Sequence, residues 1–155
     1  MLINDKTFPH YEIANYIHEY ICELFGNSIV LDDYDYDFSS AGMGYFEINY
    51  VYLPTRLKVK VEHDRLFLVI YIIDPSINDD NKMYSNSNTV TTMLSQVKNQ
   101  KMDTGLSVDK VQSQVIALYD ILVNNDPKFY PTKRKGRIKN GKIVSYWEEY
   151  WEEHS

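Results

Sequence analysis

The residues most able to take part in chemistry lie in an acidic, tyrosine-rich stretch near the start of the chain. It spans residues 29–38 and reads IVLDDYDYDF. Side chains alternate between the two faces of an extended strand. A strand here would therefore separate carboxylates from rings, with Asp33, Asp35 and Asp37 on one face and Tyr34, Tyr36 and Phe38 on the other.

Carboxylates that share one face of a strand repel each other, and three interpretations would account for them. The first is an edge strand whose charges block pairing with other chains, or one that pairs beside Lys58 and Lys60. The second is a calcium loop, which is disfavoured because the glycine and distal glutamate of an EF-hand are absent. The third is a surface that docks onto a basic site of another protein, formed by Asp32, Asp33, Tyr34, Asp35, Tyr36 and Asp37.

No other group of residues matches a catalytic motif. The sequence has no P-loop, dinucleotide fingerprint, metalloprotease motif, nucleophile elbow or paired-cysteine zinc site. The pair Gly42-x-Gly44 lacks the further residues of a nucleotide loop and is interpreted as a hairpin connection. The single Cys22 falls in a predicted helix and is interpreted as a buried structural thiol, because free cysteines are usually buried.

The histidines do not form an obvious ligand set. His10 and His18 are about 80° apart around a helix axis, so both are interpreted as surface or capping residues. His63 is interpreted as a turn residue beside Asp64. The chain is therefore predicted to be non-enzymatic, with no cofactor and no metal ion. The alternative is a catalytic domain whose acid and base are carboxylates far apart in the sequence.

The elements that must position these residues centre on residues 45–73. Three strands are predicted there, Tyr45–Leu53, Arg56–Glu62 and Leu66–Ile73. The middle strand alternates apolar and charged residues, as expected when one face is buried. The third is apolar throughout, which predicts that both of its faces are covered. With the acidic strand they would form a four-stranded antiparallel sheet.

Helices are predicted to pack on one face of that sheet. They span Pro9–Phe25, residues 89–102 and Ser107–Val123, and Ser107 is a suitable N-cap. The fold class is therefore α+β, in the order α-β-β-β-β-α-α, followed by a basic hairpin and an amphipathic C-terminal helix. The whole chain, residues 1–155, is expected to form a single domain, and any sub-boundary would fall in the polar loop 75–88.

The segment Gly105-Leu106-Ser107, followed by apolar residues at helical spacing, resembles the turn and recognition helix of helix-turn-helix DNA-binding proteins. A basic segment with the hairpin signal Asn-Gly follows at 133–142, like the wing of a winged helix-turn-helix. An ordinary helical hairpin that stops at a glycine would give the same pattern. The resemblance implies DNA binding through Lys110, Gln112, Lys133, Arg134, Lys135, Arg137 and Lys139.

Composition limits the classes of function. The chain has 155 residues and a formal net charge of −6, which disfavours a general nucleic-acid binder because such proteins use Lys and Arg to displace counterions. No apolar run approaches the roughly 20 residues of a transmembrane helix, and the N-terminus lacks the pattern of a signal peptide. A cytoplasmic protein with no membrane association is expected.

These observations favour a small, acidic, non-enzymatic binding protein. It would act as a stoichiometric inhibitor of another protein, in the manner of immunity proteins or phage-borne anti-CRISPR proteins, and could compete with nucleic acid for a basic surface on that partner. The alternative is a DNA-binding protein that uses the helix pair 89–123 and the basic hairpin 133–142.

Overall fold

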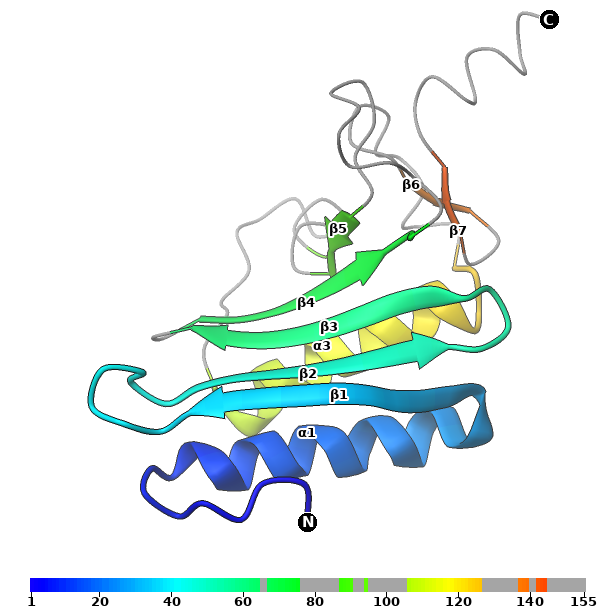
Figure 1. Ribbon diagram of the computed structural model, residues 1–155. Helices are drawn as coiled ribbons and strands as arrows, with labels where there is room; N and C mark the ends of the chain where they lie inside the picture. Colours follow the sequence, from blue (N-terminus) through cyan, green and yellow to red (C-terminus); the bar gives the residue numbers. More distant parts are fainter. Residues whose placement is uncertain are drawn as a thin grey trace, which may run out of the picture.

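The protein is an α+β structure with helices on one side of an antiparallel sheet (Figure 1). The computed structural model describes residues 1–64, 67–75, 87–90, 94, 106–126, 137–139 and 142–144. The elements, in chain order, are α1 (His10–Phe25), the short 3-10 helix η1 (Gly26–Ser28), β1 (Ile29–Asp37), β2 (Tyr45–Tyr52), β3 (Leu57–Asp64), β4 (Phe67–Ile73), β5 (Ser87–Thr89), α3 (Val108–Leu122), β6 (Arg137–Lys139) and β7 (Lys142–Val144).

The main sheet has the order β1-β2-β3-β4-β5, and each neighbouring pair is antiparallel. Two predictions about it are wrong. His63 and Asp64 continue β3 instead of forming a turn, and Ser87–Asn88, expected in the polar loop, form part of β5 against β4. The acidic strand β1 is at the edge, as predicted, but it pairs with β2 and not beside Lys58 and Lys60.

The core lies between this sheet and the two long helices. Alternate residues of β2, β3 and β4 are buried, as the period of a strand with one covered face requires. In β4 the alternation persists although every residue is apolar: Leu68, Ile70 and Ile72 are buried, whereas Phe67 is 60% exposed. The prediction that both faces of this strand are covered is therefore wrong at Phe67.

Helix α1 packs its apolar stripe against the sheet and also holds the start of the chain. Its last residue is Phe25, and the C-cap Gly26 follows with a φ of 57°, which suits a residue without a Cβ. Ile17 and Ile21 are fully buried. The side chain of Asn15 accepts a hydrogen bond from the Ile3 amide at 2.8 Å and donates one to the Ile3 carbonyl at 2.7 Å. The first residues are thereby fixed against the helix.

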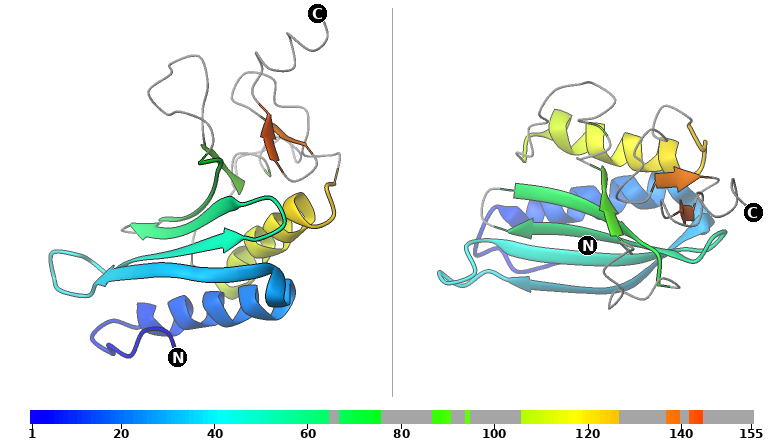
Figure 2. Two further views of the ribbon diagram at one scale, coloured as in Figure 1. Left: turned by 45° about the vertical axis from the view of Figure 1, so that its right-hand side comes forward. Right: turned by 90° about the horizontal axis from the view of Figure 1, so that it is seen from above.

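Helix α3 lies beside α1 on the same side of the sheet (Figure 2). It begins as predicted, because the Ser107 hydroxyl accepts a hydrogen bond from the Lys110 amide at 3.4 Å. Its buried side includes Gln114, whose Nε2 donates to the Leu68 carbonyl of β4 at 3.1 Å. This bond ties the helix to the central part of the sheet.

Other predicted elements are described only in part. Of the helix expected at 89–102, Thr89, Val90 and Leu94 are described. Thr89 belongs to β5 and is not helical, whereas Val90 and Leu94 are helical and buried. Strands β6 and β7 confirm the hairpin predicted around Asn140-Gly141. The predicted C-terminal helix lies outside the described residues. None of the described helices is both long and apolar enough to cross a bilayer.

Candidate functional site

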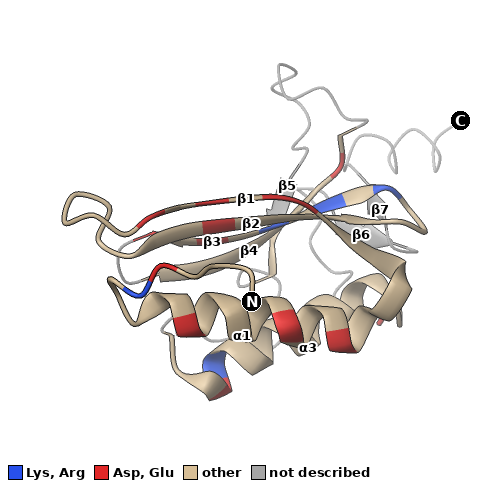
Figure 3. Cartoon of the chain, turned by 60° about the horizontal axis from the view of Figure 1, so that its bottom comes forward, with Lys and Arg blue, Asp and Glu red and all other residues tan. Residues whose placement is uncertain are grey.

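Figure 3 shows that α1 and α3 cover one face of the sheet, and the opposite face is here called the outer face. Asp33, Asp35 and Asp37 of β1 are assigned to the outer face by their pairing with β2. The register pairs Asp33 with Asn49, Asp35 with Glu47, and Asp37 with Tyr45. These partners alternate with the buried residues of β2, so they point away from the helices. The prediction that the three aspartates share one face is confirmed.

A row of three carboxylates crosses the outer face from strand to strand. Asp35 of β1 is opposite Glu47 of β2, and Glu47 is opposite Glu62 of β3. We call Asp35, Glu47 and Glu62 the acidic row. Like charges at directly opposite positions destabilise a sheet. The fold therefore maintains a concentration of negative charge that disfavours its own stability.

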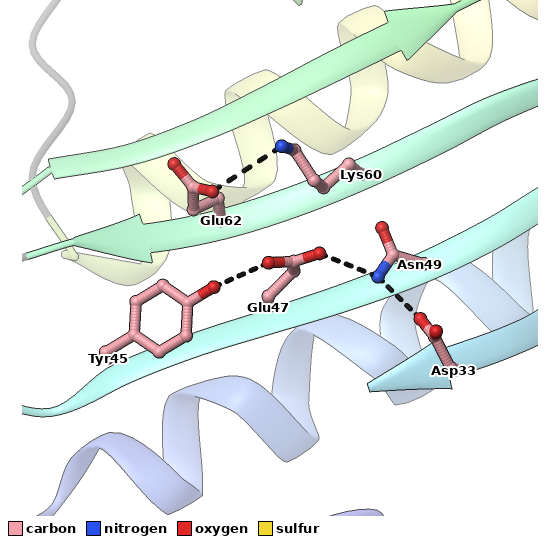
Figure 4. A network of polar contacts seen from close by, with 6 residues as sticks. All are labelled: Asp33, Tyr45, Glu47, Asn49, Lys60 and Glu62. Carbon is pink, nitrogen blue, oxygen red and sulfur yellow. Dashed lines mark hydrogen bonds and ion pairs between the residues drawn. The ribbon is translucent and has the colours of Figure 1, made fainter. Parts of the chain in front are cut away.

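Hydrogen bonds hold the carboxylates of this face in defined positions (Figure 4). The Tyr45 hydroxyl donates to Glu47 Oε2 at 2.5 Å, and Asn49 Nδ2 donates to Glu47 Oε1 at 2.9 Å. Asn49 Nδ2 also donates to Asp33 Oδ1 at 2.6 Å, which links β2 to β1. On β3, Lys60 Nζ lies 3.6 Å from Glu62 Oε2. Both oxygens of Glu47 are therefore engaged from within its own strand.

The same contacts keep Glu47 charged. Partial burial by itself would raise the pKa of its carboxyl, but the hydrogen bonds from Tyr45 and Asn49 and the charge of Lys60 outweigh burial and lower the pKa. The pKa of Tyr45 is raised, first by burial and then by its hydrogen bond to Glu47 and the nearby carboxylates. At neutral pH Glu47 is therefore an anion and Tyr45 a hydrogen-bond donor.

The remaining predicted residues of β1 are placed differently. Tyr34 and Tyr36 are opposite the buried Ile48 and Phe46, on the side of the helices, yet they are 43% and 36% exposed. Asp32 lies at a register shift between Leu31 and Asp33, a β-bulge, and is also exposed. The six predicted residues thus form a strand edge with an acidic side and an aromatic side.

Sequence reasoning missed the contribution of the neighbouring strands. Glu47 and Asn49 of β2 and Glu62 of β3 extend the acidic face inwards from the edge. The alternation of β2 could have indicated that Glu47 and Asn49 point outwards. Their alignment with Asp35 and Asp33 depends on the register, which the bulge at Asp32 shifts by one residue.

The candidate DNA-binding residues are scattered or partly engaged. Gln112 Nε2 donates to the Tyr16 hydroxyl at 2.8 Å, and Lys110 is half-buried. The exposed positions of α3 within Asp109–Leu122 are Asp109, Ser113 and Ile116, which provide no positive charge. Lys133, Arg134 and Lys135 lie outside the described residues. Arg137 and Lys139 belong to β6, where Lys139 is opposite Lys142.

The histidines and the cysteine occupy other positions than expected. His63 is fully buried and its ring centroid lies 4.8 Å from that of His10. His18 Nδ1 lies 2.9 Å from the hydroxyl of the buried Tyr50. The prediction of a buried thiol is wrong, because Cys22 is exposed on α1.

Cys22 lacks the environment of a nucleophilic cysteine. Partial desolvation raises the pKa of the Cys22 thiol, whereas a nucleophilic cysteine requires a lowered one. Its Sγ lies 3.8 Å from His18 Nε2, and burial lowers the pKa of His18. Within the described ranges, no three His, Cys, Asp or Glu side chains are grouped closely enough to hold a metal ion.

Comparison of the chain with protein-family models, with curated proteins and with solved structures gave no match.

Proposed function

We propose that the protein is a non-enzymatic binding protein that uses its acidic outer face to cover a basic surface on another protein. The observation that carries the proposal is the acidic row together with Asp33 and Asp37, all on the face left open by α1 and α3. Charged groups arranged in this way steer a basic partner into contact and select its orientation. A protein that occupies a surface built for nucleic acid would inhibit its partner stoichiometrically.

The pattern of hydrogen bonds supports a binding role for these charges. Exposed carboxylates with no constraint contribute little to binding, because ordering them costs entropy. Glu47 and Asp33 are already ordered by Asn49 and Tyr45. A partner that supplies Lys or Arg side chains would therefore meet carboxylates whose positions are largely fixed, which reduces the entropic cost of association.

A charge-matched pair of variants tests the proposal. The first is Asp33→Asn, Asp35→Asn and Asp37→Asn together, which neutralises the outer edge. The control is Glu12→Gln, Glu19→Gln and Glu23→Gln together, because these exposed glutamates lie on α1, on the opposite side of the sheet. Both variants change the net charge by the same amount, so a difference between them reports position and not total charge.

The tagged proteins are used to capture partners from the native host, and the captured proteins are identified by mass spectrometry. The wild type and the α1 control should retain the same basic protein. The outer-face variant should bind it at least about tenfold more weakly, which is the loss expected from three ion pairs of about 0.5 kcal/mol each. Equal binding by all three proteins would show that this face is not the binding site.

Direct DNA binding is the alternative proposal. It expects a mobility shift of duplex DNA at low salt that disappears when Lys133, Arg134, Lys135 and Arg137 become Ala. The uncharged or acidic exposed positions of α3 do not favour it, because contacts to phosphate depend on Lys and Arg. Absence of a shift at low salt would eliminate this alternative.

A further inference from the structure

We propose that β1 receives its partner as an added strand, and that the partner segment is extended and alternates basic with apolar residues. The inference rests on the proposed function and specifies how the basic partner is bound. β1 lies at the edge of the sheet, and among the described strands its single neighbour is β2. From Asp33 to Asp37 it is paired with β2 without interruption, so its other edge presents a regular backbone to an incoming strand.

The direction of the backbone groups shows where a new ladder would form. The Tyr36 amide donates to Asp35 Oδ1 at 2.8 Å, so it does not donate to β2. In an antiparallel pair, hydrogen-bonded and non-hydrogen-bonded positions alternate. The backbone groups of Tyr34 and Tyr36 therefore point towards the open edge, and those of Asp33, Asp35 and Asp37 point towards β2.

This alternation determines what each side of an added strand would contact. Residues opposite Asp33, Asp35 and Asp37 would lie at the closely spaced, non-hydrogen-bonded positions, where side chains approach most nearly. Lys or Arg there would meet the acidic side. Residues opposite Tyr34 and Tyr36 would meet the aromatic side. Of the ten exposed large apolar side chains among the described residues, four lie on β1: Val30, Leu31, Tyr34 and Tyr36.

The carboxylates also exclude two other occupants of the edge. A second copy of β1 would bring its own aspartates opposite Asp33, Asp35 and Asp37, and like charges at opposite positions repel. A neutral strand would have to displace Asp35 from the Tyr36 amide without offering it a new partner. A basic strand replaces that hydrogen bond with an ion pair, so charge complementarity favours it.

A synthetic peptide with blocked ends and the sequence Thr-Lys-Val-Lys-Val-Lys-Thr tests this inference. Its matched control carries N-methyl groups on both Val residues, which keeps the charges and side chains but removes the amides that would pair with β1. Binding is followed by amide NMR of the labelled full-length protein at low salt. We expect the first peptide to shift the Tyr34 and Tyr36 amide signals, to slow their hydrogen exchange, and to bind at least tenfold more tightly than the methylated peptide.

A variant of the protein provides an independent check. Tyr36→Pro removes the amide donor of residue 36 from the open edge, where proline is tolerated. It should weaken binding of the unmethylated peptide, because a peptide carbonyl loses its donor on β1, while the circular dichroism spectrum is unchanged. Equal binding of the two peptides by the wild type would overturn strand addition and leave charge-driven docking intact. Binding of a folded basic protein without binding of either peptide would also overturn it, and would leave the proposed function standing.

Discussion

Glu47 occupies the centre of the acidic row, between Asp35 and Glu62, and yet has a lowered pKa. The hydrogen bonds from Tyr45 and Asn49 account for this combination, because they stabilise the charged form more than burial disfavours it. At the scale of single residues, the outer face therefore depends on neutral donors as much as on its carboxylates.

Removal of the Tyr45 hydroxyl should reduce the acid sensitivity of folding that Glu47 causes. A carboxyl whose pKa is lowered in the folded state stabilises the fold above its ordinary value of 4.5, and this stabilisation is lost as the pH falls through the lower, folded value. In Tyr45→Phe the pKa of Glu47 should rise, so this part of the acid-side loss should shrink. Urea unfolding at a series of acidic pH values measures it, and Glu47→Gln should lack this part entirely. An unchanged pH profile in both variants would contradict the assignment.

Neutralising one member of the acidic row should stabilise the protein. Asp35→Asn removes a carboxylate opposite Glu47 but keeps an oxygen that can accept the Tyr36 amide. We expect the free energy of unfolding to increase by about 0.5 kcal/mol at low salt, in the range measured for cross-strand pairs. Asp32→Asn, at the bulge and outside the register, serves as the control and should have a smaller effect. A destabilised Asp35→Asn would show that this carboxylate is favourable to the fold.

Several residues could not be placed from sequence for physical reasons. His63 follows a charged, alternating strand and precedes Asp64, which is typical of a turn, but the register continues through both. Cys22 belongs to an apolar helix, and only the orientation of α1 leaves it exposed. The faces of Asp33, Asp35 and Asp37 were predictable, because alternation along a strand is local.

At the scale of elements, helix α3 shows how much a local signal determines. The Ser107 cap, the acidic first turn and the apolar spacing predicted the helix to within a residue or two, because each depends on neighbours in sequence. The pairing of β1 with β2, in contrast, depends on residues far apart in the sequence. The bulge at Asp32 shifts their register by one residue, and no local pattern indicates that shift. The elements were therefore predictable, and the acidic row that crosses them was not.

The cap of α3 should be measurable in the stability of the protein. Ser107→Ala leaves the Lys110 amide without the hydroxyl acceptor and should lower the free energy of unfolding by about 1 kcal/mol. Ser113→Ala, on the exposed side of the same helix, is the matched control, because its hydroxyl only donates to the Asp109 carbonyl one turn earlier. Urea denaturation should separate the two, and equal effects would argue against a capping role.

The charges of β1 should also keep the protein from associating with itself. With Asp33, Asp35 and Asp37 changed to Asn, the edge retains exposed apolar side chains but loses the repulsion between copies. Sedimentation velocity at increasing concentration should show self-association of this variant and not of the Glu12, Glu19 and Glu23 to Gln control. A monomeric variant at all concentrations would indicate that the bulge at Asp32 suffices to protect the edge.

At the scale of the whole molecule, the separation of roles between the two faces of the sheet governs how it should interact. One face packs on α1 and α3, and the outer face concentrates carboxylates within a chain of net charge −6. The complex of the protein with a basic partner should weaken as the ionic strength rises from about 0.05 M to about 0.5 M, mainly because association becomes slower. Surface plasmon resonance would measure this, and association unaffected by salt would contradict charge-driven docking.

The double hydrogen bond between Asn15 and Ile3 bears on the order in which the chain becomes structured. An amide side chain carries both N–H donors and a carbonyl acceptor, so it can bond the amide and the carbonyl of one residue as the backbone of an adjacent strand would. The position of the first residues depends on α1, because Asn15 must be in place before it can bond to Ile3. A carboxylate in place of this amide would keep the acceptor but lose the donor to the Ile3 carbonyl, so the attachment of the leading residues to α1 would be weakened.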